Sequence, residues 1–191
     1  VVFIDSEGGF SIERVRQVLG ENEKEFETVM QNILLLNPTS FKEQEAAFSE
    51  MLNYLKHSEV SIIIIDSLVM LYRLELGDAI ESGEQSRIQE VNRKLANQLR
   101  TLNEIARKQN IPVLVTNQVY SSFVKNDNFE NKGRKVSMVG GDLLLYWSKC
   151  LLELSNYNGR RKMILRKHRS LPEKEMAFEI VDKGIKKKGL F

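Results

Sequence analysis

Acidic residues follow two apolar runs in this chain, and their position suits them to chemistry. The stretch Val60 to Ser67, VSIIIIDS, places Asp66 directly after four isoleucines. An apolar, β-branched run closed by a polar turn is typical of a strand in a parallel sheet that is covered on both faces. Ligands of such sheets bind beyond the carboxyl ends of the strands, where a carboxylate can hold magnesium for phosphoryl transfer. Asp66 is therefore a candidate magnesium ligand, and its alternative role is to cap the following turn.

Two further apolar runs end in polar residues. Val1 to Ile4 leads into the sequence DSEGG, so a second strand also ends in acidic residues. The run IPVLVT, from Ile111 to Thr116, is followed by Asn117 and Gln118. Three predicted strands thus carry polar side chains immediately after their last apolar residue.

A polar segment from Tyr120 to Val139 combines cations with aromatic side chains. A loop of this length inside a compact domain is usually functional or disordered. Binding of single-stranded nucleic acid needs cations for the phosphates and flat groups to stack on bases, and this segment has both. The alternative for the aromatic residues is local packing. The residues concerned are Phe123, Lys125, Phe129, Lys132, Arg134 and Lys135.

These residues need a scaffold, and the hydrophobic periodicity predicts alternating strands and helices. We expect helices after Ser11, over 21–31, from Ser40 to about Lys56, over 86–109 and over 141–147. Further strands are expected at 33–36, 150–154, 162–166 and 176–181. The alternation predicts an α/β fold with a doubly wound, mostly parallel sheet and right-handed crossovers. The Asn-Gly pair near residue 158 predicts a C-terminal antiparallel hairpin.

The stretch 75–85 is polar, contains glycine and offers few core candidates, so it is expected to be a mobile loop. It is acidic overall, which suits it poorly to contact with DNA except through Arg73 at its edge. The second predicted loop, 120–139, is the basic one.

Composition narrows the class of protein. A chain of 191 residues with 42% hydrophobic residues fits one domain. Cys150 is the only cysteine and offers no disulfide or metal cluster, so a reducing cytoplasm and a buried position for this side chain are expected. No apolar run approaches the roughly 20 residues that span a bilayer, and VVFI is too short for a signal peptide.

The charge is unevenly distributed, although its net value is only +2. From Tyr157 onward eleven Lys and Arg stand against four acidic residues, and the preceding part has seventeen against twenty-two. A basic end indicates a polyanionic partner. A solvated surface with a frayed tail at Lys186 to Lys188 is the alternative.

The order of these motifs resembles that of the RecA-like recombinase family, most closely the archaeal RadB group of recombinase paralogues. The motifs are FIDSEGGFSIERV, IIIIDSLVMLYR, VLVTNQV, the long loop ending in two glycines, and KHRSLPEKEMAFEIVDKGI. Each is short, but five in one order extend over nearly the whole chain. The resemblance implies a RecA-like core domain over residues 1–191.

The resemblance implies ATP and Mg²⁺ as ligands and gives several residues a role. It makes Glu7 the general base that deprotonates the attacking water, and Gln118 the sensor of the γ-phosphate. Asp66 would hold Mg²⁺ through its water shell, with Ser67 beside it. Arg14 matches the position that packs against adenine. By position, the loops 74–85 and 120–139 correspond to the DNA-binding loops of the family.

One family motif is missing. The phosphate-binding loop, G-x-x-x-x-G-K-[ST], does not occur in these 191 residues. We expect that the chain is incomplete at its N-terminal end, because losing an interior strand would leave buried backbone groups unpaired. The N-terminal helical domain of the main archaeal recombinases is also absent from the sequence.

Three functions follow as hypotheses. The first is an accessory protein of DNA repair and homologous recombination that assists the main recombinase. Its binding to single-stranded DNA would depend on ATP or be modulated by it, and whether it forms a homo-oligomer stays open. Whether it hydrolyses ATP, weakly or with DNA, stays open. The second is a non-enzymatic mediator that contacts the recombinase, and the third is a RecA-like signalling ATPase without a DNA role. The basic aromatic loop argues against the third.

Overall fold

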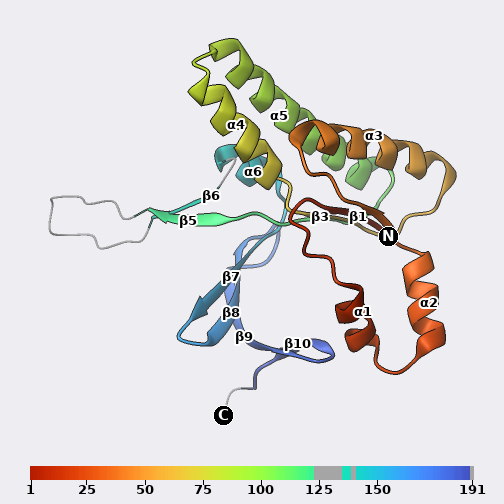
Figure 1. Ribbon diagram of the computed structural model, residues 1–191. Helices are drawn as coiled ribbons and strands as arrows, with labels where there is room; N and C mark the ends of the chain where they lie inside the picture. The colour runs from red at the N-terminus through yellow and green to blue at the C-terminus, as the bar shows by residue number, and fades with distance from the viewer. Residues whose placement is uncertain (123–134, 139–140, 190–191) are drawn as a thin grey trace, which may run out of the picture. The chain divides into compact units, whose positions relative to one another are not determined.

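Figure 1 shows the computed structural model, which describes residues 1–122, 135–138 and 141–189. The chain falls into two compact units. The first comprises Val1–Phe10 and Asn32–Leu144, and the second comprises Ser11–Gln31 and Leu145–Phe191. No helix among the described residues is long and apolar enough to cross a membrane.

The first unit is built on a parallel sheet of four strands. Its strands are β1 (Val2–Asp5), β2 (Leu34–Leu36), β3 (Ile63–Asp66) and β4 (Val113–Val115), in the order β2-β1-β3-β4. The predicted parallel α/β sheet is therefore confirmed. The register pairs Asp5 with Asp66, so the two acidic strand ends lie side by side.

Helices cover one face of this sheet. They are α3 (Phe41–His57), α4 (Met70–Glu81) and α5 (Gln85–Lys108), which lie together above the strands in Figure 1. Four residues at alternate positions of the two central strands are fully buried: Val2, Ile4, Ile63 and Ile65. Ile64 is only half-buried, so the expectation of a strand wholly buried on both faces holds for alternate residues.

Helix α3 begins where its sequence predicts. The Ser40 side chain accepts a hydrogen bond from the Glu43 amide nitrogen, which satisfies one of the free donors of the first turn. The Glu43 carboxylate in turn accepts bonds from the backbone nitrogen and hydroxyl of Thr39 at 2.7 and 2.8 Å. These bonds lower the pKa of Glu43.

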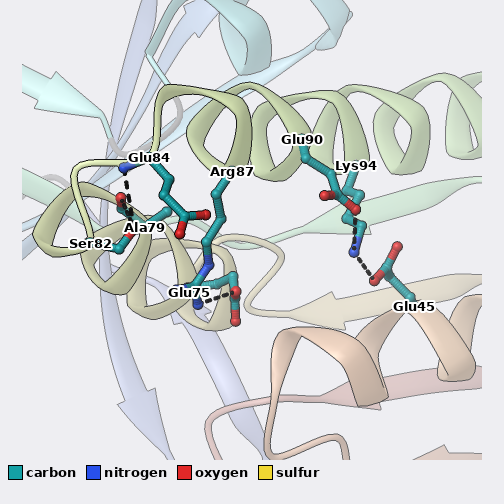
Figure 2. Close-up of polar contacts among 8 residues, drawn as sticks. All are labelled: Glu45, Glu75, Ala79, Ser82, Glu84, Arg87, Glu90 and Lys94. Carbon is teal, nitrogen blue, oxygen red and sulfur yellow. Dashed lines mark hydrogen bonds and ion pairs between the residues drawn. The ribbon is translucent and has the colours of Figure 1, made fainter.

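The predicted mobile loop at 75–85 is wrong, because most of it is helix α4. Leu71, Tyr72 and Ala79 are buried on one side of α4, and the Tyr72 hydroxyl donates a 2.7 Å bond to Asn92 on α5. Ser82 caps the C-terminal end of the helix, and its hydroxyl donates a hydrogen bond to the Ala79 carbonyl oxygen (Figure 2). The apolar spacing of these residues was a usable signal of a helix, but Glu75, Gly77 and Asp78 among them favoured the interpretation as a loop.

Two strands lie within the other predicted loop. Strands β5 (Val119–Ser122) and β6 (Lys135–Met138) pair antiparallel, so the ends of the segment 120–139 form a ladder rather than a loop. Helix α6 (Gly141–Trp147) follows with the predicted bounds.

The second unit contains the helices α1 (Ile12–Leu19) and α2 (Glu23–Gln31) and an antiparallel sheet. Its strands are β7 (Leu151–Tyr157), β8 (Arg160–Lys167), β9 (Lys174–Val181) and β10 (Gly184–Lys187), paired in chain order. Asn158 and Gly159 both have positive φ, as expected of the tight turn between β7 and β8.

One alternative and one expectation for the second unit are wrong. Strand β10 continues the sheet through Lys186 and Lys187, where a frayed tail was the alternative considered. Its sequence alternates weakly, and the pairing with β9 supplies the stability that the short strand lacks. Cys150, expected to be buried, is exposed because it precedes the first strand of the sheet.

Candidate active site

The ends of β1 and β3 are tied together by hydrogen bonds. The Ser6 hydroxyl donates to the Ser67 carbonyl oxygen at 2.7 Å and accepts from the Ser67 amide nitrogen at 2.9 Å. The Ser6 amide nitrogen donates to the Asp66 carbonyl oxygen at 2.8 Å. Ser6 and Ser67 are both buried, and the peptide bond that joins Asp66 to Ser67 is cis. The turn after Asp66 is therefore fixed to the neighbouring strand.

Asp66 also contacts the next strand in the sheet. The Thr116 hydroxyl, at the end of β4, donates to Asp66 Oδ1 at 2.6 Å. The bond holds the half-buried Asp66 carboxylate beside the carboxyl end of β4. Thr116 has no role in the sequence-based prediction, although a hydroxyl at the end of the strand beside Asp66 was a usable signal.

This arrangement suits magnesium better than a metal held by protein ligands alone. Among the described residues, no three His, Cys, Asp or Glu side chains are grouped as metal ligands. Mg²⁺ keeps several of its waters and is usually held by one or two carboxylates together with substrate phosphates. The single carboxylate of Asp66, oriented by a hydroxyl, fits that chemistry.

Asp5 holds the loop that carries Glu7. Its side chain is only 4% exposed, and its carboxylate accepts three backbone hydrogen bonds. The donors are the amide nitrogens of Glu7, Gly9 and Phe10, at 3.2, 3.1 and 2.8 Å. The loop thus wraps around a buried carboxylate, and Gly8 has a φ of 69° that suits glycine. Sequence reasoning noted this acidic strand end but gave Asp5 no role.

Two of the predicted site residues meet directly. The Gln118 side-chain nitrogen donates to Glu7 Oε1 at 3.1 Å, although 111 residues separate them in the sequence. Both side chains are exposed, so water and a ligand can reach them. The sheet thus brings a carboxylate and an amide together near the strand ends that also carry Asp66.

Arg14, the predicted adenine contact, belongs to the second unit. Its backbone nitrogen bonds to Ser11, the residue that caps α1. Its guanidinium donates to the main-chain oxygens of Val181 and Asp182 at 2.8 and 3.2 Å. These bonds connect α1 to the turn between β9 and β10 and fix the plane of the guanidinium.

The predicted DNA-binding residues are described only in part. Arg73 is exposed on α4, and Lys135 opens β6, where its backbone pairs with Ser122. Phe123, Lys125, Phe129, Lys132 and Arg134 lie outside the described residues.

The hairpin of α4 and α5 is rich in paired charges (Figure 2). Arg87 forms a 3.0 Å ion pair with Glu75, and Lys94 forms ion pairs with Glu45 and Glu90 at 3.0 and 3.3 Å. The hydrogen bonds to Glu75 and Glu45 raise the pKa of Arg87 and of Lys94, respectively. These two cations are thus already engaged with carboxylates.

Comparison with known proteins gives the family. The Rad51 family model matches residues 1–188. The DNA repair and recombination protein RadB of Methanocaldococcus jannaschii is 37% identical over 185 residues, which cover 97% of this chain and 78% of that protein. RadB of Methanothermobacter thermautotrophicus is 39% identical over 190 residues, covering 96% of this chain and 74% of that protein. RadB of Methanobrevibacter smithii is 37% identical over 190 residues, with 97% and 74% coverage.

Proposed function

Because the chain belongs to the Rad51 family of RecA-like recombinases, we propose that it is an accessory protein of DNA repair and recombination whose binding to single-stranded DNA is controlled by ATP. The observation that carries the proposal is the hydrogen bond between Glu7 and Gln118 near the carboxyl edge of β1, β3 and β4. The same edge carries the Asp66 carboxylate with its Thr116 donor. The names of the relatives support DNA repair as the process.

In this proposal Glu7 acts on a water molecule. Hydrolysis forms a bond between the water oxygen and the terminal phosphorus, breaks the bond to ADP, and passes a proton to the Glu7 carboxylate. Phosphoryl transfer needs little from a protein beyond a placed water, a metal and donors for the spread charge. Asp66, with Ser67 beside it, would hold Mg²⁺, which neutralises charge on the phosphates. Asp5 supports this step by fixing the loop on which Glu7 lies.

Gln118 is suited to report the nucleotide state. Its amide donates to Glu7, and a terminal phosphate beside Glu7 would compete for the same donor. Strand β5 starts at the next residue and pairs with β6, which begins at Lys135. A change of partner at Gln118 would therefore be passed to the paired strands β5 and β6, between which most of the predicted DNA-binding residues lie in the sequence.

The remaining predicted contacts complete the proposal. Arg14 would pack against adenine, and its two main-chain hydrogen bonds favour this because they fix a flat cation. Phe123 and Phe129 would stack on bases, whereas Lys125, Lys132, Arg134 and Lys135 would neutralise phosphates, with Arg73 as an outlying contact. The proposed protein partner is the main recombinase.

Titration of a fluorescent ATP analogue, with and without Mg²⁺, tests the proposal. Single-strand DNA binding is then measured by anisotropy, with and without ATP. We expect magnesium-dependent nucleotide binding and a DNA affinity that changes with nucleotide. A DNA affinity that is identical in the presence and absence of saturating nucleotide contradicts the proposal. The proteins compared are the wild type and Asp66→Asn, which should lose the magnesium-dependent part of nucleotide binding.

A second candidate function is that of a mediator, because the relatives are named as recombination proteins and their names do not mention ATP. A mediator that acts by contact with the main recombinase would need neither ATP nor Asp66. Co-sedimentation with the recombinase separates the two functions. If the chain is an accessory ATPase, replacing Glu7 and Asp66 should abolish its effect on the assembly of the recombinase on single-stranded DNA. If it is a mediator, the same replacements should leave that effect unchanged.

A further inference from the structure

Two buried glutamines meet behind the turn that follows Asp66. Gln44 on α3 is fully buried and Gln98 on α5 is 5% exposed. The Gln44 side-chain nitrogen donates to Gln98 Oε1 at 2.8 Å and to the Leu68 carbonyl oxygen at 3.1 Å. The pair therefore joins two helices to a backbone group that lies two residues after Asp66.

The orientation of both amides follows from their partners. Leu68 offers an oxygen, so Gln44 must present its nitrogen, and that nitrogen requires the oxygen of Gln98. Within the described part of the chain, Gln44 Oε1 and Gln98 Nε2 then have no hydrogen-bond partner. A buried polar atom without a partner costs stability, and an apolar pair of the same shape would avoid that cost. The amides thus work against stability at this position.

The glutamine pair holds the short connection between β3 and α4, residues 67–69, which is also fixed by other hydrogen bonds. The Leu68 amide nitrogen donates to the Thr116 oxygen at 3.4 Å, and the Leu68 oxygen accepts from Gln44. The Ser67 hydroxyl accepts from the amide nitrogen of Met70, the first residue of α4. Only residues 67–69 separate Asp66 from this helix, so the position of Leu68 influences both.

We infer that Gln44 and Gln98 are positioning residues of the proposed magnesium site, which hold the Leu68 carbonyl and thereby the Asp66 carboxylate and the start of α4 in one geometry. The inference rests on the proposed function of Asp66. Partners behind a metal ligand commonly change metal affinity by about 10- to 100-fold when they are replaced. The same turn leads directly to Arg73, so its geometry also determines where α4 presents that cation.

Methionine replacements test this, because methionine keeps the length of glutamine and removes its polar atoms. Gln44→Met removes the bond to Leu68, Gln98→Met keeps it, and the double variant also removes the unpaired amide atoms. Gln89→Met is the matched control, an exposed position on α5. Three quantities are measured: magnesium-dependent affinity for the ATP analogue, amide hydrogen exchange of residues 67–73, and thermal unfolding.

We expect Gln44→Met and the double variant to weaken magnesium-dependent affinity by about 10-fold or more and to speed exchange in residues 67–73. The double variant should unfold at a higher temperature than Gln44→Met, so that stability and binding separate. Gln98→Met should have a smaller effect on binding, and Gln89→Met none. A double variant with wild-type affinity and wild-type exchange overturns the inference. If the wild-type protein binds no nucleotide, the proposed function fails, and hydrogen exchange alone still decides whether the glutamines hold the turn.

Discussion

The Thr116 hydroxyl donates a 2.6 Å hydrogen bond to the Asp66 carboxylate. The two residues are 50 positions apart in the sequence and follow or end neighbouring strands of the sheet. This bond fixes the orientation of the proposed magnesium ligand. It gives Thr116 a role that depends on its hydroxyl and not on its bulk, since valine has the same shape.

Thr116→Val should therefore weaken magnesium-dependent nucleotide binding by about 10-fold or more, the usual effect of removing a partner of a metal ligand. Thr116→Ser keeps the hydroxyl and should bind nearly as well as the wild type. Titration of the ATP analogue over a range of Mg²⁺ concentrations measures the difference. Equal magnesium dependence for the valine and serine variants would show that the hydrogen bond is irrelevant to the metal.

Glu7→Gln should abolish most ATP hydrolysis and leave nucleotide binding nearly intact, because a base acts in the transition state. Loss of a general base typically lowers the rate by about 10²- to 10⁴-fold. Single-turnover hydrolysis is the measurement, in a form of the protein that binds ATP. Glu13→Gln, at an exposed carboxylate on α1, is the control and should not change the rate. Unchanged turnover in Glu7→Gln would remove the assignment of Glu7 as base.

Asp5→Asn should destabilise the loop on which Glu7 lies. The amide nitrogen of asparagine would oppose at least one of the three backbone donors that the carboxylate accepts. We expect the free energy of unfolding to fall by about 1.5 to 3 kcal/mol, the scale for hydrogen bonds to a charged group. Chemical denaturation measures this, with Asp78→Asn as an exposed control. A loss no larger than that of the control would mean that the loop does not depend on the Asp5 charge.

The sequence was informative wherever a pattern was local and unbroken. The isoleucines before Asp66 predicted β3, and the Asn-Gly pair predicted the turn between β7 and β8. Glu7 and Gln118 were predicted as site residues separately, and their direct hydrogen bond depends on the order of the strands.

Other features depend on tertiary contacts and could not be predicted in this way. Helix α4 is stabilised by its buried residues and by the hydrogen bond from Tyr72 to Asn92, and these tertiary contacts cannot be read from the polar, glycine-containing stretch 75–85. Nothing in the sequence near Gln44 indicates a bond to Gln98, 54 residues away on another helix. Strand β10 forms by pairing with the edge strand β9, whereas the sequence of β10 alone predicts a strand only weakly.

Glu43 makes the stability of α3 depend on pH. Its bonds from the Thr39 backbone nitrogen and hydroxyl lower its pKa in the folded protein below the ordinary value of 4.5. A carboxylate with a lowered folded pKa contributes stability above the ordinary value, and that contribution is lost as the pH falls through the folded pKa. Denaturation of wild type and Glu43→Gln should thus differ at neutral pH and converge in acid. A difference that persists unchanged below the folded pKa would exclude this cause.

The last prediction concerns the segment between β5 and β6 and its role in DNA binding. If Lys125, Lys132, Arg134 and Lys135 contact phosphates, each should release about 0.7 counterion on single-stranded DNA. Replacing all four by alanine should then flatten the slope of log affinity against log salt by up to roughly three units. Phe129→Ala should weaken binding by about 1 to 3 kcal/mol if a base stacks there, and leave the salt slope almost unchanged.

The competing site is the basic end of the second unit, where Lys186 and Lys187 lie on β10. A site there makes the opposite prediction: replacing Lys186, Lys187 and Lys188 by alanine would flatten the slope, while the four-residue variant would keep it. Alanine is used instead of a deletion because removing these residues would also remove backbone pairs with β9. Anisotropy titrations of a labelled single strand at several salt concentrations distinguish the two sites. An unaltered slope in the four-residue variant would mean that the segment between β5 and β6 does not hold DNA.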